Sequence, residues 1–151
     1  MSLRIEVDEL RATVSTVGGA RLEALLYVHR HEGATSAPET VRRQLNDLRT
    51  NFLPCEAENA TRLLQVERIA YVAFKDGVSD GALDGEDGAA RTDLTLELVT
   101  GDILRATLVY HAKPGDRASD YLNSTRDRFL LVLADLGVVY VNRGAIEQIL
   151  F

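Results

Sequence analysis

The chain has 151 residues, of which 46% are hydrophobic and 26% charged, and its formal net charge is −6. Its length allows one domain or two very small ones. No apolar run approaches the roughly 20 residues of a membrane-spanning helix, and the first residues contain no hydrophobic signal core. The single cysteine, Cys55, excludes an internal disulfide. We therefore expect a cytoplasmic protein that does not enter a membrane.

A pattern of residues occurs twice in the chain, in the same order. Residues 13–29 match residues 95–111 without a gap at seven of seventeen positions. Residues 40–72 match residues 117–149 at seven further positions, which include Leu45-Asn46 against Leu122-Asn123. Self-similarity of this kind indicates a duplicated architecture. We predict two repeats, over residues 1–74 and 94–151, joined by a linker at residues 75–93.

Each repeat has the residue pattern of short strands. In the second repeat, apolar and polar residues alternate at 95–98 and 104–111, and Gly101 between these runs is typical of a tight hairpin turn. Gly19 occupies the same place in the first repeat. Runs at 128–134, 137–142 and 145–151 predict further strands. So many short strands favour a bent sheet that closes into a small barrel, because closure removes exposed edges. For residues 4–10, a strand and a helical turn both remain open.

A short helix is predicted between the second and third strands of each repeat. Val41, Leu45 and Leu48 have helical spacing, and Pro38 suits a first helical turn. Ser119 is the candidate N-cap in the second repeat. The predicted fold class is therefore mainly β with short helices, arranged as two tandem, duplicated small β-barrels.

The linker is rich in glycine and acid. Residues 75–93 contain four glycines and six acidic residues, and residues 76–93 sum to −5 of the chain's −6 charge. A calcium loop would need oxygen ligands at alternate positions and a glutamate at position twelve. Counting from Asp76, position three is Val78 and position twelve is Asp87. We favour a solvated linker.

Candidate metal and catalytic residues are few. His29 and His31 form a His-x-His pair and His111 matches His29, but the sequence offers no acidic or cysteine cluster to complete a metal site. Cys55 follows Pro54 and carries no catalytic signature. We predict no enzyme activity, no metal and no cofactor, and leave open whether the histidines bind anything.

The repeated Leu-Asn pair allows two interpretations. Asn46 and Asn123 could be structural, because asparagine bonds nearby backbone groups and suits turns. Alternatively, the asparagines and nearby Arg126, Arg128 and Arg143 could contact a ligand.

The second repeat resembles the signature blocks of Sm-like small barrels, in Asp120-Tyr121-Leu122-Asn123 and in the run from Val139 to Ile146. The resemblance implies a short helix with a strongly bent five-stranded barrel, rings formed through edge strands, and RNA binding. It implies Asn123, Arg143 and Gly144 as the RNA-binding positions. The chain departs from the family pattern, because the first repeat has Val66-Glu67 in place of Arg-Gly. Residues 117–123 also resemble a segment of uncharacterised bacterial proteins, which implies no activity.

Two functions follow from these patterns. The first is a non-enzymatic binding or assembly module that self-associates or binds a protein partner, because strand edges pair readily with other chains. Leu25, Tyr27 and Val109 would supply apolar contacts on outer faces. The second is Sm-like RNA binding, against which the net charge of −6 and the absence of tryptophan weigh. We favour assembly, and nothing in the sequence indicates DNA.

Overall fold

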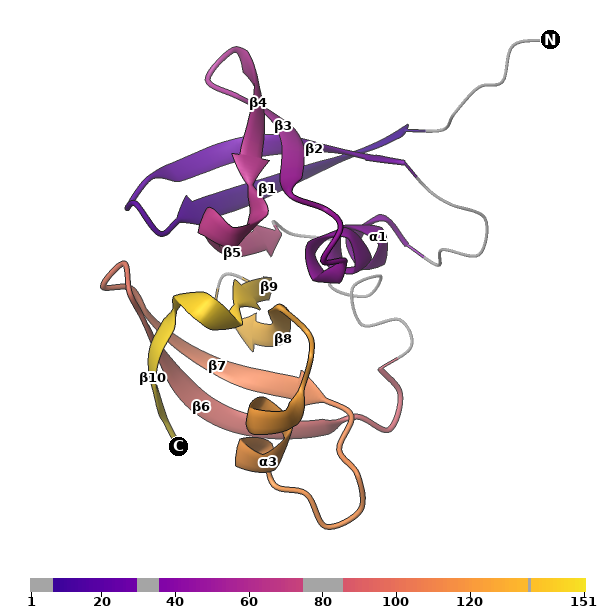
Figure 1. Cartoon of the computed structure of the whole chain (residues 1–151), viewed down its shortest axis with the longest axis vertical. Helices are drawn as coiled ribbons and strands as arrows, with labels where there is room; N and C mark the ends of the chain where they lie inside the picture. Colours follow the sequence, from indigo (N-terminus) through magenta and orange to yellow (C-terminus); the bar gives the residue numbers. More distant parts are fainter. Residues whose placement is uncertain (1–6, 30–35, 75–85, 136) are drawn as a thin grey trace, which may run out of the picture.

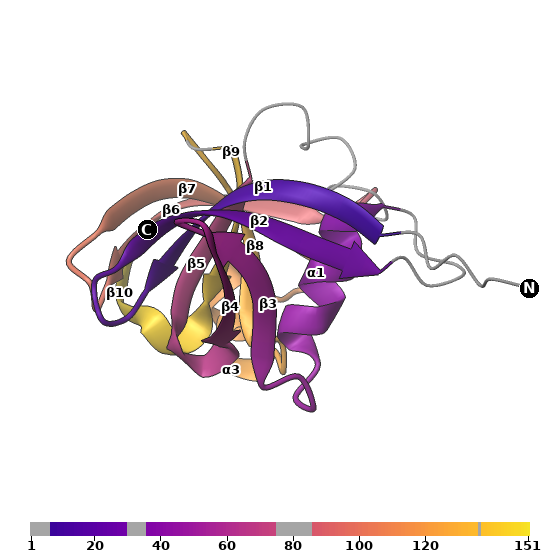
Figure 2. The same ribbon diagram turned by 90° about the horizontal axis from the view of Figure 1, so that it is seen from above.

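The computed structural model describes residues 7–29, 36–74, 86–135 and 137–151. In these ranges the protein is mainly β, with ten strands in one antiparallel sheet and two short α-helices. Figure 1 shows the two halves of the chain above one another, and Figure 2 shows how strongly the long strands curve. Neither described helix has the length and apolar character needed to cross a bilayer.

The two halves contain the same elements in the same order. The first half comprises β1 (Val7–Thr16), β2 (Arg21–His29), α1 (Ala37–Asn46), β3 (Phe52–Ala57), β4 (Ala60–Gln65), the 3₁₀ turn η1 (Val66–Arg68) and β5 (Ile69–Phe74). The second half comprises β6 (Ala90–Leu98), β7 (Ile103–Tyr110), α3 (Ala118–Ser124), β8 (Phe129–Ala134), β9 (Gly137–Asn142), the 3₁₀ turn η2 (Arg143–Ala145) and β10 (Ile146–Leu150). The mainly β prediction with short helices is confirmed, and from Val7 onward the open N-terminal segment is strand.

The sheet order is β10-β6-β7-β8-β9-β5-β1-β2-β3-β4. Within each half the order is therefore the fifth, first, second, third and fourth strand of that half. The halves meet where β9, the fourth strand of one, pairs antiparallel with β5, the fifth strand of the other. Among the described strands, β4 and β10 end the sheet with one neighbour each. Closure of each repeat into a barrel is not observed, because β5 and β9 pair with each other across the halves.

The agreement between the halves extends to single residues. The hairpins β1–β2 and β6–β7 turn at Gly19 and Gly101, whose φ angles are 92° and 90°. Ala70 in β5 is the extra residue of a bulge against β1, and Glu147 in β10 is the extra residue of the corresponding bulge against β6. A bulge is a local irregularity, so its presence at equivalent positions supports the repeat alignment.

The core is divided into two clusters that meet at the junction between the halves. β5, β8 and β9 supply residues to both clusters, and all six residues of β5 are buried. Val109, expected on an outer face, is buried because it packs into the cluster formed mainly by the first half. Leu25 and Tyr27 are half-buried. Near the junction, both faces of the strands are therefore buried.

The helices differ in detail from the prediction. α1 begins after Ser36, whose hydroxyl accepts a hydrogen bond from the Glu39 N–H at 3.2 Å. It ends at Asn46, so the expected third apolar contact, Leu48, is 72% exposed. Ser119 does not cap α3. The N-cap is Arg117, whose backbone N–H donates to the Asp120 carboxylate at 2.8 Å and thereby lowers the pKa of that carboxyl.

The linker prediction is only partly covered by the described residues. β6 begins at Ala90, so the last four residues of the predicted linker are strand. Glu86 is nearly buried and pairs with Arg42 of α1 and with His111. Residues 75–85, which hold most of the candidate calcium loop, lie outside the described residues.

Candidate functional site

The junction between the halves is centred on the paired strands β5 and β9. Val72 lies opposite Tyr140, and the Tyr140 ring packs edge to face against Phe74 at 5.2 Å between ring centroids. The Tyr140 hydroxyl donates to the Pro38 carbonyl of α1 at 3.1 Å. Burial raises the pKa of Tyr140 far above its ordinary value, so the hydroxyl stays protonated and keeps donating. The strand pair thus also holds α1 in place.

Asn46, the last residue of α1, joins the halves through its side chain. Its Oδ1 accepts a hydrogen bond from the Phe129 N–H at 2.7 Å, and its Nδ2 donates to the Phe129 carbonyl at 3.4 Å. Phe129 begins β8 and is fully buried. The amide therefore satisfies both backbone groups of a buried residue that would otherwise lack partners. In the first half, the repeated asparagine is structural.

Arg128 completes the same contact by capping α1. Its guanidinium donates to the carbonyls of Leu45 (3.2 Å), Asp47 (3.0 Å) and Thr50 (3.2 Å). Carbonyls at a helix C-terminus lack partners within the helix, and a positive charge there is favourable. Arg128, considered a ligand contact in the sequence, therefore binds the first half of the chain.

Asn142 ties the end of β9 to the first half. Its Nδ2 donates to the carbonyls of Ile69 (2.9 Å) and Glu67 (3.3 Å), and its Oδ1 accepts from the Gly144 N–H at 2.9 Å. This buried side chain thus links β9, η2 and the start of β5.

The three residues predicted to bind RNA lie in two segments of the second half that touch each other. Asn123, Arg143 and Gly144 are all exposed, in α3 and η2. The Arg143 guanidinium donates to the carbonyl of Thr125, the residue that follows α3. Arg126 is exposed in the same segment. The structure therefore places the end of α3 beside η2, although it ties Arg143 to the protein backbone.

The other candidate residues form no cluster. His111 is exposed, with its Nε2 2.8 Å from the Glu86 carboxylate; the His29 side chain and His31 lie outside the described residues. The described residues contain no group of three or more potential metal ligands. Cys55 is fully buried, and burial raises the pKa of its thiol. A protonated, enclosed thiol is a poor nucleophile.

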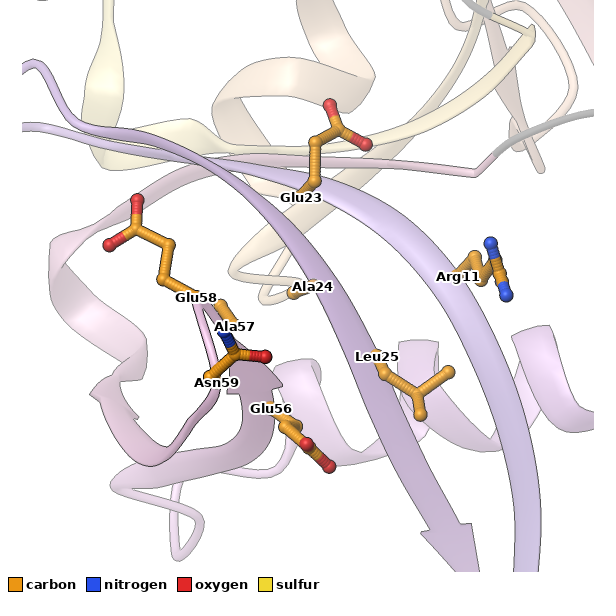
Figure 3. Close-up of a pocket in the computed structure, with 8 residues that line it drawn as sticks. All are labelled: Arg11, Glu23, Ala24, Leu25, Glu56, Ala57, Glu58 and Asn59. Carbon is orange, nitrogen blue, oxygen red and sulfur yellow. The ribbon is translucent and has the colours of Figure 1, made fainter.

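A shallow hollow of about 300 Å³ lies over β2 and the β3–β4 turn. Figure 3 shows that its glutamates, Glu23, Glu56 and Glu58, point in different directions. Tyr27 donates to Glu56, and Arg62 pairs with Glu58 at 3.2 Å. The acidic groups do not converge on one point, so the hollow lacks the arrangement that metal binding or acid–base chemistry needs.

The residues of the junction have counterparts at the two ends of the sheet. The repeat alignment matches Phe129 with Phe52, Tyr140 with Leu63, Phe74 with Phe151, and Asn46 with Asn123. Phe129 and Tyr140 are 0% exposed and Phe74 is 2% exposed, whereas Phe52 is 52%, Leu63 65% and Phe151 72% exposed. The sequence analysis did not identify these three exposed apolar residues as a possible binding surface. The one available signal was that Phe52 and Phe129 are identical in the repeat alignment.

Replacing the two matched asparagines should have unequal effects. Asn46→Ala should lower the free energy of unfolding by about 1–3 kcal/mol, because it leaves the buried Phe129 backbone without a partner. Asn123→Ala, at the exposed counterpart, should change it by less than about 0.5 kcal/mol. Urea denaturation at low protein concentration measures both. Equal losses would contradict the assignment of Asn46 to the junction.

Comparison with protein-family models, with curated proteins and with solved structures finds no match to the chain. The resemblance of the second repeat to Sm-like barrels therefore stays a prediction.

Proposed function

We propose that the protein is a non-enzymatic assembly module that binds polypeptide through the two ends of its sheet and self-associates in this way. In this proposal each half is an Sm-like small-barrel unit that opens to pair with its neighbour. The five strands of each half, their curvature and the short helix support this interpretation (Figure 2).

The main support for this proposal is the exposure of apolar side chains at both ends of the sheet. A terminal strand presents unpaired N–H and C=O groups that readily pair with another strand. At the β4 end, Phe52 and Leu63 are 52% and 65% exposed; at the β10 end, Leu150 and Phe151 are 44% and 72% exposed. Burying each such side chain would contribute about 1.5–3 kcal/mol. Both ends therefore combine backbone and apolar binding potential.

The absence of an assembled reactive group supports the non-enzymatic part of the proposal. Among the described residues, the one thiol is enclosed, and the glutamates of the hollow over β2 and the β3–β4 turn diverge (Figure 3). The histidine with a described side chain, His111, is paired with Glu86. Catalysis would need a nucleophile or base held by an orienting group.

Self-association can be measured directly on the purified full chain. Light scattering coupled to size-exclusion chromatography should give a mass that is a multiple of 16.6 kDa and falls on dilution. An apolar contact should persist at high salt, whereas an assembly held by surface charges would weaken. A mass of 16.6 kDa at every concentration up to the millimolar range would contradict self-association.

RNA binding is the alternative function, favoured by one observation. Arg143 of η2 contacts Thr125 after α3, and Asn123 and Arg126, the residues two before and one after Thr125, are exposed. If this region binds RNA, a mobility shift with short U- or A-rich RNA should weaken steeply as salt rises. The double variant Asn123→Ala, Arg143→Ala should abolish that shift. No shift at low salt would exclude this function, and a shift retained by the double variant would exclude this region.

A further inference from the structure

We propose that β4 of one copy pairs antiparallel with β10 of a second copy, and so repeats between chains the contact that β9 and β5 make within one chain. This inference rests on the proposed self-association and identifies its surface and its partner. It concerns the two strands that end the sheet in the described part of the chain.

The topology of the sheet specifies the partner. β4 and β9 are the fourth strands of their halves, and β5 and β10 are the fifth strands. Within the chain, a fourth strand already pairs with a fifth strand of the other half. Among the described strands, β4 and β10 each have a neighbour on one side only, and they lie in different halves (Figure 1). A second copy can therefore meet β10 with its β4 just as the second half meets β5 with its β9.

The backbone of β4 is oriented for this pairing. In an antiparallel pair, opposite residues alternate between those that exchange hydrogen bonds and those that do not. Pro54 of β3 lies opposite Leu63, and proline has no N–H to donate. The Pro54–Leu63 pair is therefore one that does not exchange hydrogen bonds. The N–H and C=O of Leu63 consequently point away from β3, toward the free edge.

The register of β10 matches that of β5. Ile149 lies opposite Leu96 of β6, and its counterpart Val72 lies opposite Val14 of β1. The bulges at Glu147 and Ala70 fall at the same distance from this pair. Val72 meets Tyr140 across the junction. Transferring this register to the free edges places Ile149 of one copy opposite Leu63 of the next.

The exposed side chains match the buried ones of the junction. Leu63 of one copy would pack on Phe151 of the other, as Tyr140 packs on Phe74 within the chain. Asn123 of one copy would bond the backbone of Phe52 in the other copy, as Asn46 bonds the backbone of Phe129 within the chain. The second Leu-Asn pair thus takes the role of the first, between chains instead of within one.

The contact between chains should be weaker than the junction. In the repeat alignment, Asn51 takes the position of Arg128, so the helix-capping guanidinium has no counterpart. Leu63 takes the position of Tyr140 but has no hydroxyl to donate, and the polar Gln148 takes the position of Tyr71. The two copies also lose translational freedom on pairing, whereas the two halves of one chain are already joined. The pairing should therefore dissociate on dilution, while the junction persists in the monomer.

The contact joins unlike surfaces, so it is head-to-tail. Each copy offers one β4 and one β10, and a head-to-tail contact produces a closed ring or an open filament. A two-fold contact of β4 with β4 would instead stop at a dimer. This difference makes the two arrangements separable by experiment.

Two proline variants test the pairing. Leu63→Pro removes the outward N–H of β4, and Ile149→Pro removes the corresponding group of β10; proline is tolerated on a strand edge that faces solvent. Each variant alone should elute as a monomer of 16.6 kDa, with the circular dichroism and cooperative melting of the wild type. Their equimolar mixture should form a heterodimer of twice that mass, because one intact β4 meets one intact β10.

The outcomes separate this inference from the proposed function. A wild type that is monomeric at all concentrations overturns both. An oligomeric wild type whose mass neither proline variant reduces overturns the strand pairing only. Dimers of Ile149→Pro alone would show contact of β4 with β4 and overturn the head-to-tail arrangement, as would a mixture that stays monomeric.

Two substitutions of opposite charge provide a second test if a proline variant does not fold. Leu63→Lys and Ile149→Glu each place a charge opposite an apolar residue, so each alone should lose most of its oligomer. The double variant should recover it, because the two charges lie directly opposite in the proposed register. Asn123→Ala should raise the concentration at half-dissociation several-fold without altering the melting of the monomer. Loss that the double variant does not recover would contradict the register.

Discussion

The antiparallel pairing of β5 with β9 is the contact on which the architecture depends. It turns two groups of five strands into one sheet, and it buries every residue of β5. Asn46, Arg128 and Asn142 reinforce it by bonding backbone groups of the opposite half. These side chains satisfy polar groups that the apolar contact removes from water, and an unsatisfied group there would cost about 1–3 kcal/mol. Strand pairing, helix capping and core packing therefore stabilise the same junction.

The same strand positions differ sharply in burial between the two halves. β9 is buried along nearly its whole length, whereas β4, its counterpart, is largely exposed. β5 is fully buried, whereas β10 is exposed at most of its positions. The residue types match this difference in burial only in part. Arg62 and Gln148 are polar, and their aligned counterparts Val139 and Tyr71 are buried. The exposed positions Phe52, Leu63 and Phe151 are nevertheless apolar. The two ends of the sheet therefore carry apolar side chains beside polar ones, whereas the junction is almost entirely apolar.

Period-2 alternation and glycine turns were sufficient to predict the strands and the hairpins at Gly19 and Gly101, and Pro38 marked the start of α1. Alternation could not show which edges pair, because the hydrogen-bonding groups of every strand backbone are alike. The burial of Val109 was therefore mispredicted, because it depends on where the halves meet. The exposure of Leu48 was mispredicted for another reason, because α1 ends at Asn46, two residues before it. The roles of Asn46 and Arg128 likewise needed the fold, because their partners lie about eighty residues away in the chain.

Hydrogen exchange measured residue by residue tests the central claim most directly, because each amide reports whether its own strand edge is paired. The account predicts slow exchange of the Tyr140 amide at every protein concentration. It predicts that the Leu63 amide exchanges rapidly in dilute solution and becomes protected as the protein assembles. Rapid exchange at Tyr140 in the folded monomer would contradict the junction, and a Leu63 amide that stays unprotected in the oligomer would contradict its repetition between chains.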